Sequence, residues 1–188
     1  MSLLPITLYG DKILRKKVSE VKQVDNEIIQ LITDMFDTMR NAGGIVLAAN
    51  QVGANKSIFV IDISNVEGYE NSKPLTLINP EIINYSEEKI IFEEGCLSIP
   101  DMRAEVERPE SIRISYYDTD LKEQTLNAKK LLSRVMQHEY DHLNGVLFID
   151  LLDDETRKIM REPLAKISKR DIEVEYPVSK SKDYQLVL

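Results

Sequence analysis

The chain has 188 residues, of which 43% are hydrophobic and 30% are charged, the composition of an ordinary globular protein. This length fits one domain, so we expect residues 1–188 to form a single domain. The formal net charge of −8 argues against a nucleic-acid-binding protein, which needs a basic surface to contact phosphates, so we expect no DNA partner.

The first ten residues, M-S-L-L-P-I-T-L-Y-G, lack the basic start and long apolar run of an export signal. No stretch approaches the roughly 18 consecutive apolar residues of a membrane span. Cys96 is the single cysteine and cannot form a disulfide within the chain, which suits a reducing compartment. These features predict a cytoplasmic protein without a membrane segment, in which the Cys96 thiol is free for another role.

Residues 27–40 predict an amphipathic helix, because apolar residues recur with helical spacing after Asp25 and Asn26. The residues on this stripe are Ile28, Ile32, Met35, Phe36 and Met39. Gly43 and Gly44 end the helix and open the sequence G-I-V-L-A-A-N-Q at residues 44–51. Small residues there let the backbone lie close against a ligand or another segment. A tight connection from a helix to a strand explains them equally well.

The middle of the chain alternates in polarity like short β-strands joined by tight turns. The expected strands are residues 57–63, 75–79, 88–92, 104–108, 111–117 and 121–126. We expect Pro80 to stop the second strand, and Pro100 to break any structure that continues from E-E-G-C-L-S-I-P at residues 93–100. Gly95 permits a sharp turn before Cys96, and D-T-D at 118–120 makes another. Short connections of this kind predict antiparallel pairing.

Residues 136–145, M-Q-H-E-Y-D-H-L-N-G, contain both histidines of the chain. The apolar residues around them predict a helix that begins at an Asn127 cap and stops at Gly145. These residues are Ala128, Leu131, Leu132, Val135, Met136 and Leu143. His138 and His142 are four residues apart and share one helix face, where two imidazoles can bind one ion.

Glu139 lies beside the two histidines and is well placed to reach a water on such an ion. A catalytic metal site needs three protein ligands and one open position. The third ligand is either a downstream glutamate, Glu155 or Glu162, or Cys96, whose thiolate would complete a Cys-His-His set. Without a third ligand, the motif is a chance match whose histidines make hydrogen bonds in the core.

Asp153 and Asp154 predict the start of a last helix that runs toward Arg161, with Pro163 either kinking or restarting it. From about residue 166 onward, charges mix with Val and Tyr without a clear period. We expect a tail of only partial order there. The sequence contains no internal repeat and no linker that would divide it into domains.

Three motifs together resemble the peptide deformylase family. Its members carry G-x-G-φ-A-A-x-Q (φ, hydrophobic), E-G-C-x-S and Q-H-E-x-D-H in this order, and here the motifs stand at residues 44–51, 94–98 and 137–142. The second and third match fully, and the resemblance runs from about Leu3 to about Leu152. It implies an α+β fold in which antiparallel sheets pack around the histidine-bearing helix, with a helix near each end.

The resemblance implies that Cys96, His138 and His142 bind one divalent metal ion. Fe²⁺ is the ion expected first, with Ni²⁺, Co²⁺ or Zn²⁺ able to occupy the same site, and one thiolate with two imidazoles suits all of them. Exposed iron and a thiolate of low pKa both oxidise readily. The resemblance therefore also implies an activity that is sensitive to air.

The implied reaction is hydrolysis of the formyl group from the N-terminal formylmethionine of new polypeptides, with release of formate. Glu139 is the implied general base and acid. Gln51 and the backbone N–H of Leu97 are the implied donors to the developing oxyanion. N-formylmethionyl nascent peptides are then the partners, and we expect proximity to the ribosome, where such chains appear. The basic residues that point toward it are Lys166, Lys169 and Arg170.

Methionine specificity needs an apolar pocket beside the metal. Leu131 and Val135 precede His138 on the same helix face, and Ile45 and Phe92 are expected opposite them. The stem of Arg134 either lines this pocket, with its guanidinium at the mouth, or points to water.

Further candidates for substrate binding are Gly44, Val46 and Arg103. Arg103 resembles a residue that lines the peptide cleft, and a pair between Glu94 and Arg108 would fix the turn that carries Cys96. A solvated surface charge is the alternative for these three charged residues.

Val46 departs from the family pattern, because it replaces the second glycine of the first motif. A β-branched side chain there narrows the cleft, so we expect deformylation at a reduced rate. Two alternatives stand beside this expectation. One is a weakened or inactive deformylase-like protein that only binds formylmethionine; the other is an H-E-x-x-H metalloendopeptidase with a third ligand other than cysteine.

Overall fold

The computed structural model describes residues 2–188. Three α-helices are present in that range: α1 (Asn26–Asn41), α2 (Lys130–Leu143) and α3 (Asp154–Lys169). The short 3₁₀ helices are η1 (Lys12–Arg15), η2 (Ala49–Val52) and η3 (Phe148–Leu151). The strands are β1 (Val46–Ala48), β2 (Ile58–Ile61), β3 (Leu75–Tyr85), β4 (Lys89–Cys96), β5 (Ile99–Pro109), β6 (Ser111–Tyr117) and β7 (Glu123–Lys129).

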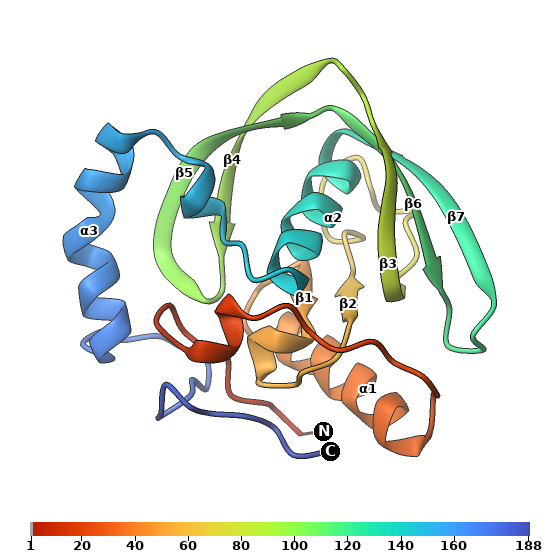
Figure 1. The fold of residues 1–188 in the computed structure, drawn as a ribbon, viewed down its shortest axis with the longest axis horizontal. Helices are drawn as coiled ribbons and strands as arrows, with labels where there is room; N and C mark the ends of the chain where they lie inside the picture. The colour runs from red at the N-terminus through yellow and green to blue at the C-terminus, as the bar shows by residue number, and fades with distance from the viewer. Residues whose placement is uncertain (1) are drawn as a thin grey trace.

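The strands form two antiparallel sheets, one of five strands in the order β1-β2-β3-β6-β7 and one two-stranded ribbon, β4-β5. Helix α2 lies in the middle of the molecule, with the ribbon on one side and β3, β6 and β7 on the other (Figure 1). The α+β fold with sheets around the histidine-bearing helix is therefore confirmed. None of the helices within residues 2–188 has the length and apolar character needed to cross a membrane.

Helix α1 forms where the apolar stripe predicted it. The Asp25 side chain accepts a hydrogen bond from the Ile28 N–H at 3.0 Å, which satisfies one of the free donors at the helix start. Ile28 and Met35 are buried in a core that includes Leu47 from β1 and Val60 from β2. The helix thereby holds the first strands of the sheet, and with them the segment that leads to η2.

Strand β3 continues through Pro80, so the prediction that this proline stops the strand was wrong. The pairing of β3 with β6 shifts between Ile78 and Glu81, and Asn79 has a φ of 48°. Such an irregularity leaves a residue without a ladder partner, so a proline there breaks no ladder hydrogen bond. The Asn79 side chain also accepts from the Val21 N–H at 2.9 Å and donates to the Val21 carbonyl at 2.8 Å.

Strand β5 contains Pro100, so the prediction that this residue breaks the structure was also wrong. The register of the ribbon jumps from Gly95 opposite Arg103 to Cys96 opposite Ile99. Pro100 therefore lies where no regular pairing needs its missing N–H. The predicted strands at 88–92 and 104–108 are confirmed and extend further. The resulting tight hairpin places Cys96 at the tip of the ribbon.

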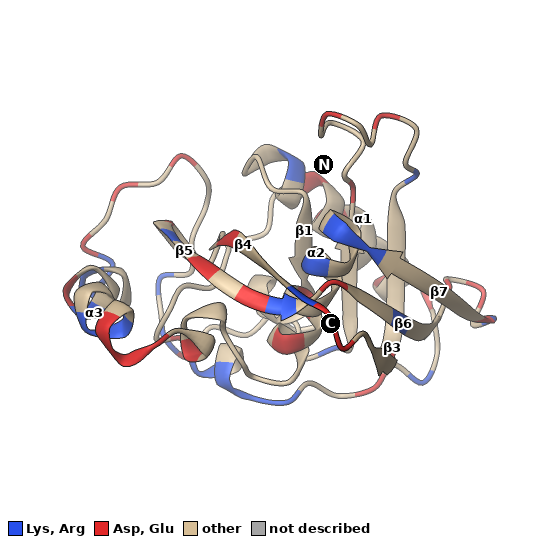
Figure 2. Cartoon of the chain, turned by 90° about the horizontal axis from the view of Figure 1, so that it is seen from above, with Lys and Arg blue, Asp and Glu red and all other residues tan. Residues whose placement is uncertain are grey.

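The charged residues of β5 divide between the two faces of the strand. Asp101, Arg103, Glu105 and Glu107 are exposed. Acidic and basic residues are interspersed along this strand (Figure 2). Arg108 faces inward and is buried. A strand alternates its side chains between faces, so β5 presents charge to solvent on one side and one buried guanidinium to the protein on the other.

Helix α2 begins at Lys130, and the predicted N-cap at Asn127 was wrong. Asn127 and Ala128 belong to β7, whose ladder with β6 extends to the pair of Lys129 and Ser111. Lys130 has a φ of 54°, which turns the chain sharply from strand into helix. The strand predicted at residues 121–126 is shifted toward the C-terminus for the same reason. The predicted stop at Gly145 is confirmed, since α2 ends at Leu143.

Helix α3 starts at the predicted cap, where Asp153 accepts from the Thr156 N–H at 2.8 Å, and continues through Pro163 as one element. The chain then returns to the N-terminal residues, so that the two ends lie side by side (Figure 1). We call residues 171–188 the C-terminal segment. Val178 forms a parallel bridge with Ile6, and the Leu186 N–H donates to the Gly53 carbonyl at 2.8 Å.

Candidate metal centre

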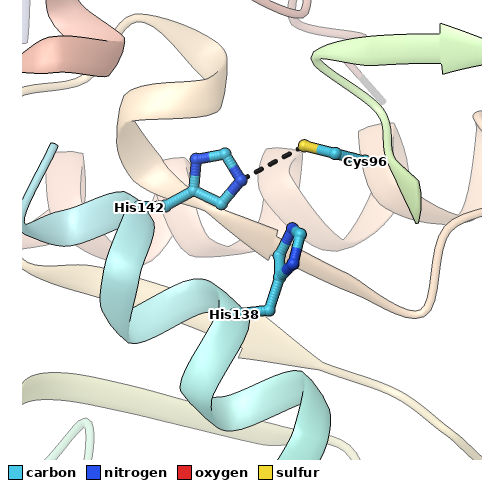
Figure 3. Close-up of side chains that lie close together, drawn as sticks. All are labelled: Cys96, His138 and His142. Atoms are coloured by element: carbon cyan, nitrogen blue, oxygen red, sulfur yellow. Dashed lines mark hydrogen bonds between the residues drawn. The ribbon is translucent and has the colours of Figure 1, made fainter. Parts of the chain in front are cut away.

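Three side chains from two distant elements converge at the centre of the molecule. Cys96 comes from the tip of the β4-β5 ribbon, and His138 and His142 come from adjacent turns of α2. The candidate donor atoms of the three residues all lie within 4.8 Å of one another. The Cys96 Sγ is 3.2 Å from the His142 Nε2, and both imidazoles lie beside the thiol (Figure 3). One ion can therefore contact all three.

The chemistry of these donors fits a divalent transition metal. The His138 Nδ1 is 2.9 Å from the Glu94 Oε2, which leaves Nε2 free to bind an ion in the orientation typical of metal-binding histidines. Burial lowers the pKa of His142 well below its ordinary value and keeps that ring neutral, as a ligand must be. One thiolate and two imidazoles leave a fourth tetrahedral position open.

The downstream glutamates do not reach this site. Glu155 and Glu162 are exposed on α3, and Glu162 pairs with Lys166 at 3.4 Å. Within residues 2–188, the one cluster of His, Cys, Asp and Glu side chains able to hold an ion is Cys96, His138 and His142. Of the two alternatives for the third ligand, the geometry favours the thiol.

Glu94 contacts His138 and connects it to a buried ionic network. Its carboxylate accepts from the Arg108 Nε at 2.7 Å and Nη2 at 3.1 Å, and from the Arg134 Nη1 at 2.8 Å. Burial alone would raise the pKa of Glu94, but hydrogen bonds from His138 and Arg108 and their charges bring it well below its ordinary value. Glu94 therefore stays charged. Neither Glu94 nor Arg108 is a solvated surface residue, since each is at most 6% exposed.

Arg134 points into the protein, not to water. Its Nη1 also donates to the Val106 carbonyl at 2.8 Å, and its Nη2 donates to the Ile90 carbonyl at 2.6 Å. The guanidinium lies 5.5 Å from the centre of the Phe92 ring. Arg134 therefore ties α2 to both strands of the ribbon, and fixes the distance between the two histidines and Cys96.

Glu139 is buried, with 1% of its surface exposed, and its Oε2 has no hydrogen-bond partner among the described residues. Burial raises its pKa to about 7, against the opposing effect of His138. A buried carboxylate oxygen without a partner is unfavourable unless a ligand or water occupies the position. With a pKa near neutrality, Glu139 is suited to accept and release a proton at this site.

Gln51 lies on η2, next to the Cys96 thiol, and Leu97 directly follows Cys96 in the chain. The Gln51 Oε1 accepts from the Ala48 N–H at 2.8 Å, which orients the amide nitrogen toward the Cys96 Sγ at 3.4 Å and the Ser98 Oγ at 3.2 Å. A Cβ on Gly44 would lie 2.8 Å from the Leu97 Cδ1, so a glycine at this position allows the close contact. These contacts bring the first and second sequence motifs together.

A cavity of about 940 Å³ opens beside Cys96, His138 and Glu139. All the residues that the sequence nominated for substrate binding lie on its wall. They are Gly44, Ile45, Val46, Phe92, Arg103, Leu131, Arg134 and Val135. Residues 44–51 thus provide both the connection from α1 to β1 and part of the cavity wall.

The sequence analysis missed one part of this wall. Residues 173–176 of the C-terminal segment line the cavity, and the Tyr176 hydroxyl donates to the Leu97 carbonyl at 2.8 Å. Arg40, at the end of α1, lines it as well. No motif marks these positions, and their placement depends on contacts between residues far apart in the chain. The one available signal was the recurrence of apolar residues such as Val174 and Tyr176 within a charged stretch.

Comparison of the sequence with known proteins finds peptide deformylases. The family model for polypeptide deformylase matches residues 3–158. Peptide deformylase of Chlorobium phaeovibrioides is 43% identical over 179 residues, which cover 95% of this chain and 94% of that protein. Peptide deformylase of Salinibacter ruber is 44% identical over 183 residues, or 94% of each chain.

Solved structures of peptide deformylases share the same architecture. The crystal structure from Ehrlichia chaffeensis matches with a TM-score of 0.82 and 37% identity, covering 90% of this chain and 99% of that one. A plant peptide deformylase matches with a TM-score of 0.84 and 36% identity, covering 94% and 97%.

Proposed function

The chain belongs to the polypeptide deformylase family, a family of metal-dependent enzymes that remove the N-formyl group from nascent peptides, and we propose that Cys96, His138 and His142 hold its metal ion. The observation that carries this assignment is the convergence of the three donor atoms within 4.8 Å. Under this proposal the third ligand is a thiol, whereas the metalloendopeptidase alternative requires a third ligand other than cysteine.

We propose Fe²⁺ as the ion, with Ni²⁺, Co²⁺ or Zn²⁺ able to occupy the same donors. A ferrous site with a thiolate ligand is prone to oxidation. The test compares the lifetime of formate-releasing activity in air with its lifetime under anaerobic conditions with reductant. A shorter lifetime in air supports iron, whereas equal lifetimes contradict it.

Glu139 is the proposed general base and acid. When bound, a divalent ion supplies Lewis acidity that lowers the pKa of a water toward about 7. Glu139 accepts a proton from the attacking water and delivers it to the leaving amine, so one carboxylate serves both halves of the reaction. Its pKa of about 7 and the free Oε2 beside the cavity support this role.

Gln51 and the Leu97 N–H are the proposed donors to the oxyanion that develops on the formyl oxygen. The Gln51 amide is held by Ala48 and directed toward the thiol, and Leu97 follows the thiol in the chain. Both groups are fixed before the substrate arrives, so they stabilise the transition state without reorganisation. Loss of one such donor typically lowers the rate by about 10² to 10³.

The substrate's methionine side chain is proposed to lie in the apolar part of the cavity. Ile45, Phe92, Leu131 and Val135 line the cavity there, and Val46 is proposed to lie along the substrate backbone. Arg134 contributes the stem of its side chain, while its guanidinium serves the Glu94 network. Arg103 and Gly44 are proposed to contact the peptide at the cavity wall.

We further propose that residues 1–188 act as a single catalytic domain in the cytoplasm, near ribosomes, where formylated chains emerge. This proposal rests on the substrate and no longer on the basic residues near the end of α3. Arg170 is turned toward Asp11 and Ser179, and Lys166 pairs with Glu162.

The test of the function is formate release from formyl-Met-Ala-Ser by anaerobically prepared protein. A Glu139→Ala variant serves as the blank, and we expect it to retain metal while losing about 10² to 10⁴ of the rate. A wild-type protein that binds the formyl peptide and releases no formate would instead indicate a formylmethionine-binding module.

A further inference from the structure

Residues 6–9 connect the C-terminal segment to Gln51 and to Ser98, the residue that follows Leu97. On one side, the Ile6 N–H donates to the Pro177 carbonyl at 2.8 Å, and the Ser179 N–H donates to the Ile6 carbonyl at 2.9 Å. On the other side, the Thr7 N–H donates to the Gln51 carbonyl at 2.8 Å, and the Tyr9 N–H donates to the Ser98 carbonyl at 2.8 Å. One extended stretch of backbone therefore aligns the C-terminal segment with residues 51 and 98.

The C-terminal segment is also fixed by a buried polar cluster. Asp11 is 1% exposed and accepts from the Ser179 hydroxyl at 2.5 Å and from the Arg170 guanidinium. Further along, the Tyr184 ring lies so close to Gly53 that a Cβ there would be 2.5 Å from it. These contacts anchor the chain at Arg170, at residues 177–179 and at Tyr184, and Tyr176 lies between the first two of these anchors.

Leu97 is held from two directions. Its side chain packs against Gly44, and its carbonyl accepts the hydrogen bond from the Tyr176 hydroxyl at 2.8 Å. A tyrosine hydroxyl ordinarily titrates near pH 10, so it is a donor at neutral pH. The N–H and the carbonyl of Leu97 belong to the two peptide planes on either side of one Cα. The hydrogen bond to the carbonyl holds the second plane, so it reduces the rotations by which this turn, and the N–H on it, can move.

We propose that Tyr176 is a positioning residue for deformylation, which holds the Leu97 N–H in the orientation that binds the oxyanion through its hydrogen bond to the Leu97 carbonyl. This inference rests on the proposed function, in which that N–H is an oxyanion donor. Tyr176 lies outside the range that the family model matches, which ends at residue 158. The C-terminal segment thus has a part in catalysis, although it contributes no group that touches the reacting atoms.

The test compares Tyr176→Phe with Tyr184→Phe. Both variants remove a hydroxyl from the C-terminal segment and keep the ring, and the Tyr184 hydroxyl has no hydrogen-bond partner within residues 2–188. Activity is measured on formyl-Met-Ala-Ser with each full-length protein loaded with the same metal. In parallel, the order parameter of the Leu97 N–H is measured by ¹⁵N relaxation in the Zn²⁺-loaded proteins.

We expect Tyr176→Phe to lower kcat about three- to tenfold, the value of one ordinary hydrogen bond, with KM within about twofold of wild type. We also expect a lower order parameter at Leu97, and an unchanged metal content and unfolding midpoint. Tyr184→Phe should match wild type in all of these measurements.

If kcat is unchanged in Tyr176→Phe, the inference is wrong. The proposed function still stands in that case, provided that the wild-type protein releases formate. An unchanged order parameter at Leu97 overturns the inference as well. If the wild-type protein releases no formate but the order parameter falls in Tyr176→Phe, the proposed function fails and Tyr176 still holds Leu97. The two failures are therefore distinguishable.

Discussion

Glu94 on β4 and Arg108 on β5 form a bidentate pair, with hydrogen bonds of 2.7 and 3.1 Å between side chains that are almost completely buried. Arg108 also donates to Asp141 at 2.6 Å, so the pair joins the ribbon to α2. The ribbon carries the thiol and α2 carries the imidazoles. The relative position of the proposed metal ligands therefore depends on a buried ionic network in which this pair is central.

Arg108→Met is expected to destabilise the protein by about 3 to 5 kcal/mol, because it leaves the Glu94 charge buried with one cation fewer. The free energy of unfolding, from urea titration of the apo protein, measures the effect. Arg113→Met on the exposed face of β6 is the matched control and should change stability by less than about 0.5 kcal/mol. Similar values for the two variants would contradict a structural role for the pair.

Val46→Gly is expected to raise kcat/KM on formyl-Met peptides, because Val46 lines the cavity beside the metal site and a glycine would widen it. Loss of a side chain within β1 also costs about 0.5 to 1 kcal/mol of stability, so the unfolding midpoint should fall slightly. Steady-state kinetics at equal metal content measures the first effect. An unchanged or lower kcat/KM would show that the cleft accommodates the valine.

Cys96→Ala is expected to abolish tight metal binding, since it removes one of three ligands, and formate release should disappear with it. Elemental analysis after gel filtration gives the metal content, with the Glu139→Ala protein as the control that keeps its ion. Full metal occupancy in Cys96→Ala would revive the metalloendopeptidase alternative.

Asp62 should make the stability depend on pH. Hydrogen bonds from Ser64 and Arg40 lower the pKa of Asp62 below its ordinary value of 3.8. A carboxyl whose pKa is lower in the folded state stabilises the fold above its unfolded pKa, and this contribution disappears as the pH falls through the folded pKa. Asp62→Asn should therefore unfold at a lower temperature than wild type at pH 7, and the gap should narrow below about pH 4. A gap independent of pH would contradict this linkage.

The elements with strong local signals were predictable. The apolar stripe after Asp25 and Asn26 specifies α1, and alternation specifies β6 at Ser111–Tyr117. The errors arose where tertiary pairing overrides local preference: Pro80 and Pro100 lie at irregular points of the ladders, and the β6-β7 ladder keeps Asn127 in a strand. A sequence shows neither a shift in register nor the partner that a strand will find.

The three candidate metal ligands were predictable, because the spacing of residues within a motif determines where their side chains lie. Two histidines four residues apart on a helix must share a face, and the cysteine motif supplied a third donor. The sequence did not determine the direction of the Arg134 side chain, because a helix residue at that position can point to a pocket or to a neighbouring strand. The contribution of Tyr176 was out of reach, because it depends on the return of the chain from α3 to Ile6.

The thiol lies on the β4-β5 ribbon and the two imidazoles lie on α2, so an ion bound to all three would join two separate elements. An ion that joins them acts as a crosslink between residues 96 and 138, in the manner of a staple across a long loop. An ion bound by these proposed ligands would therefore add a link at the hairpin tip to the one that Arg108 and Arg134 already make, so metal-loaded protein should unfold at a higher temperature than the apo protein.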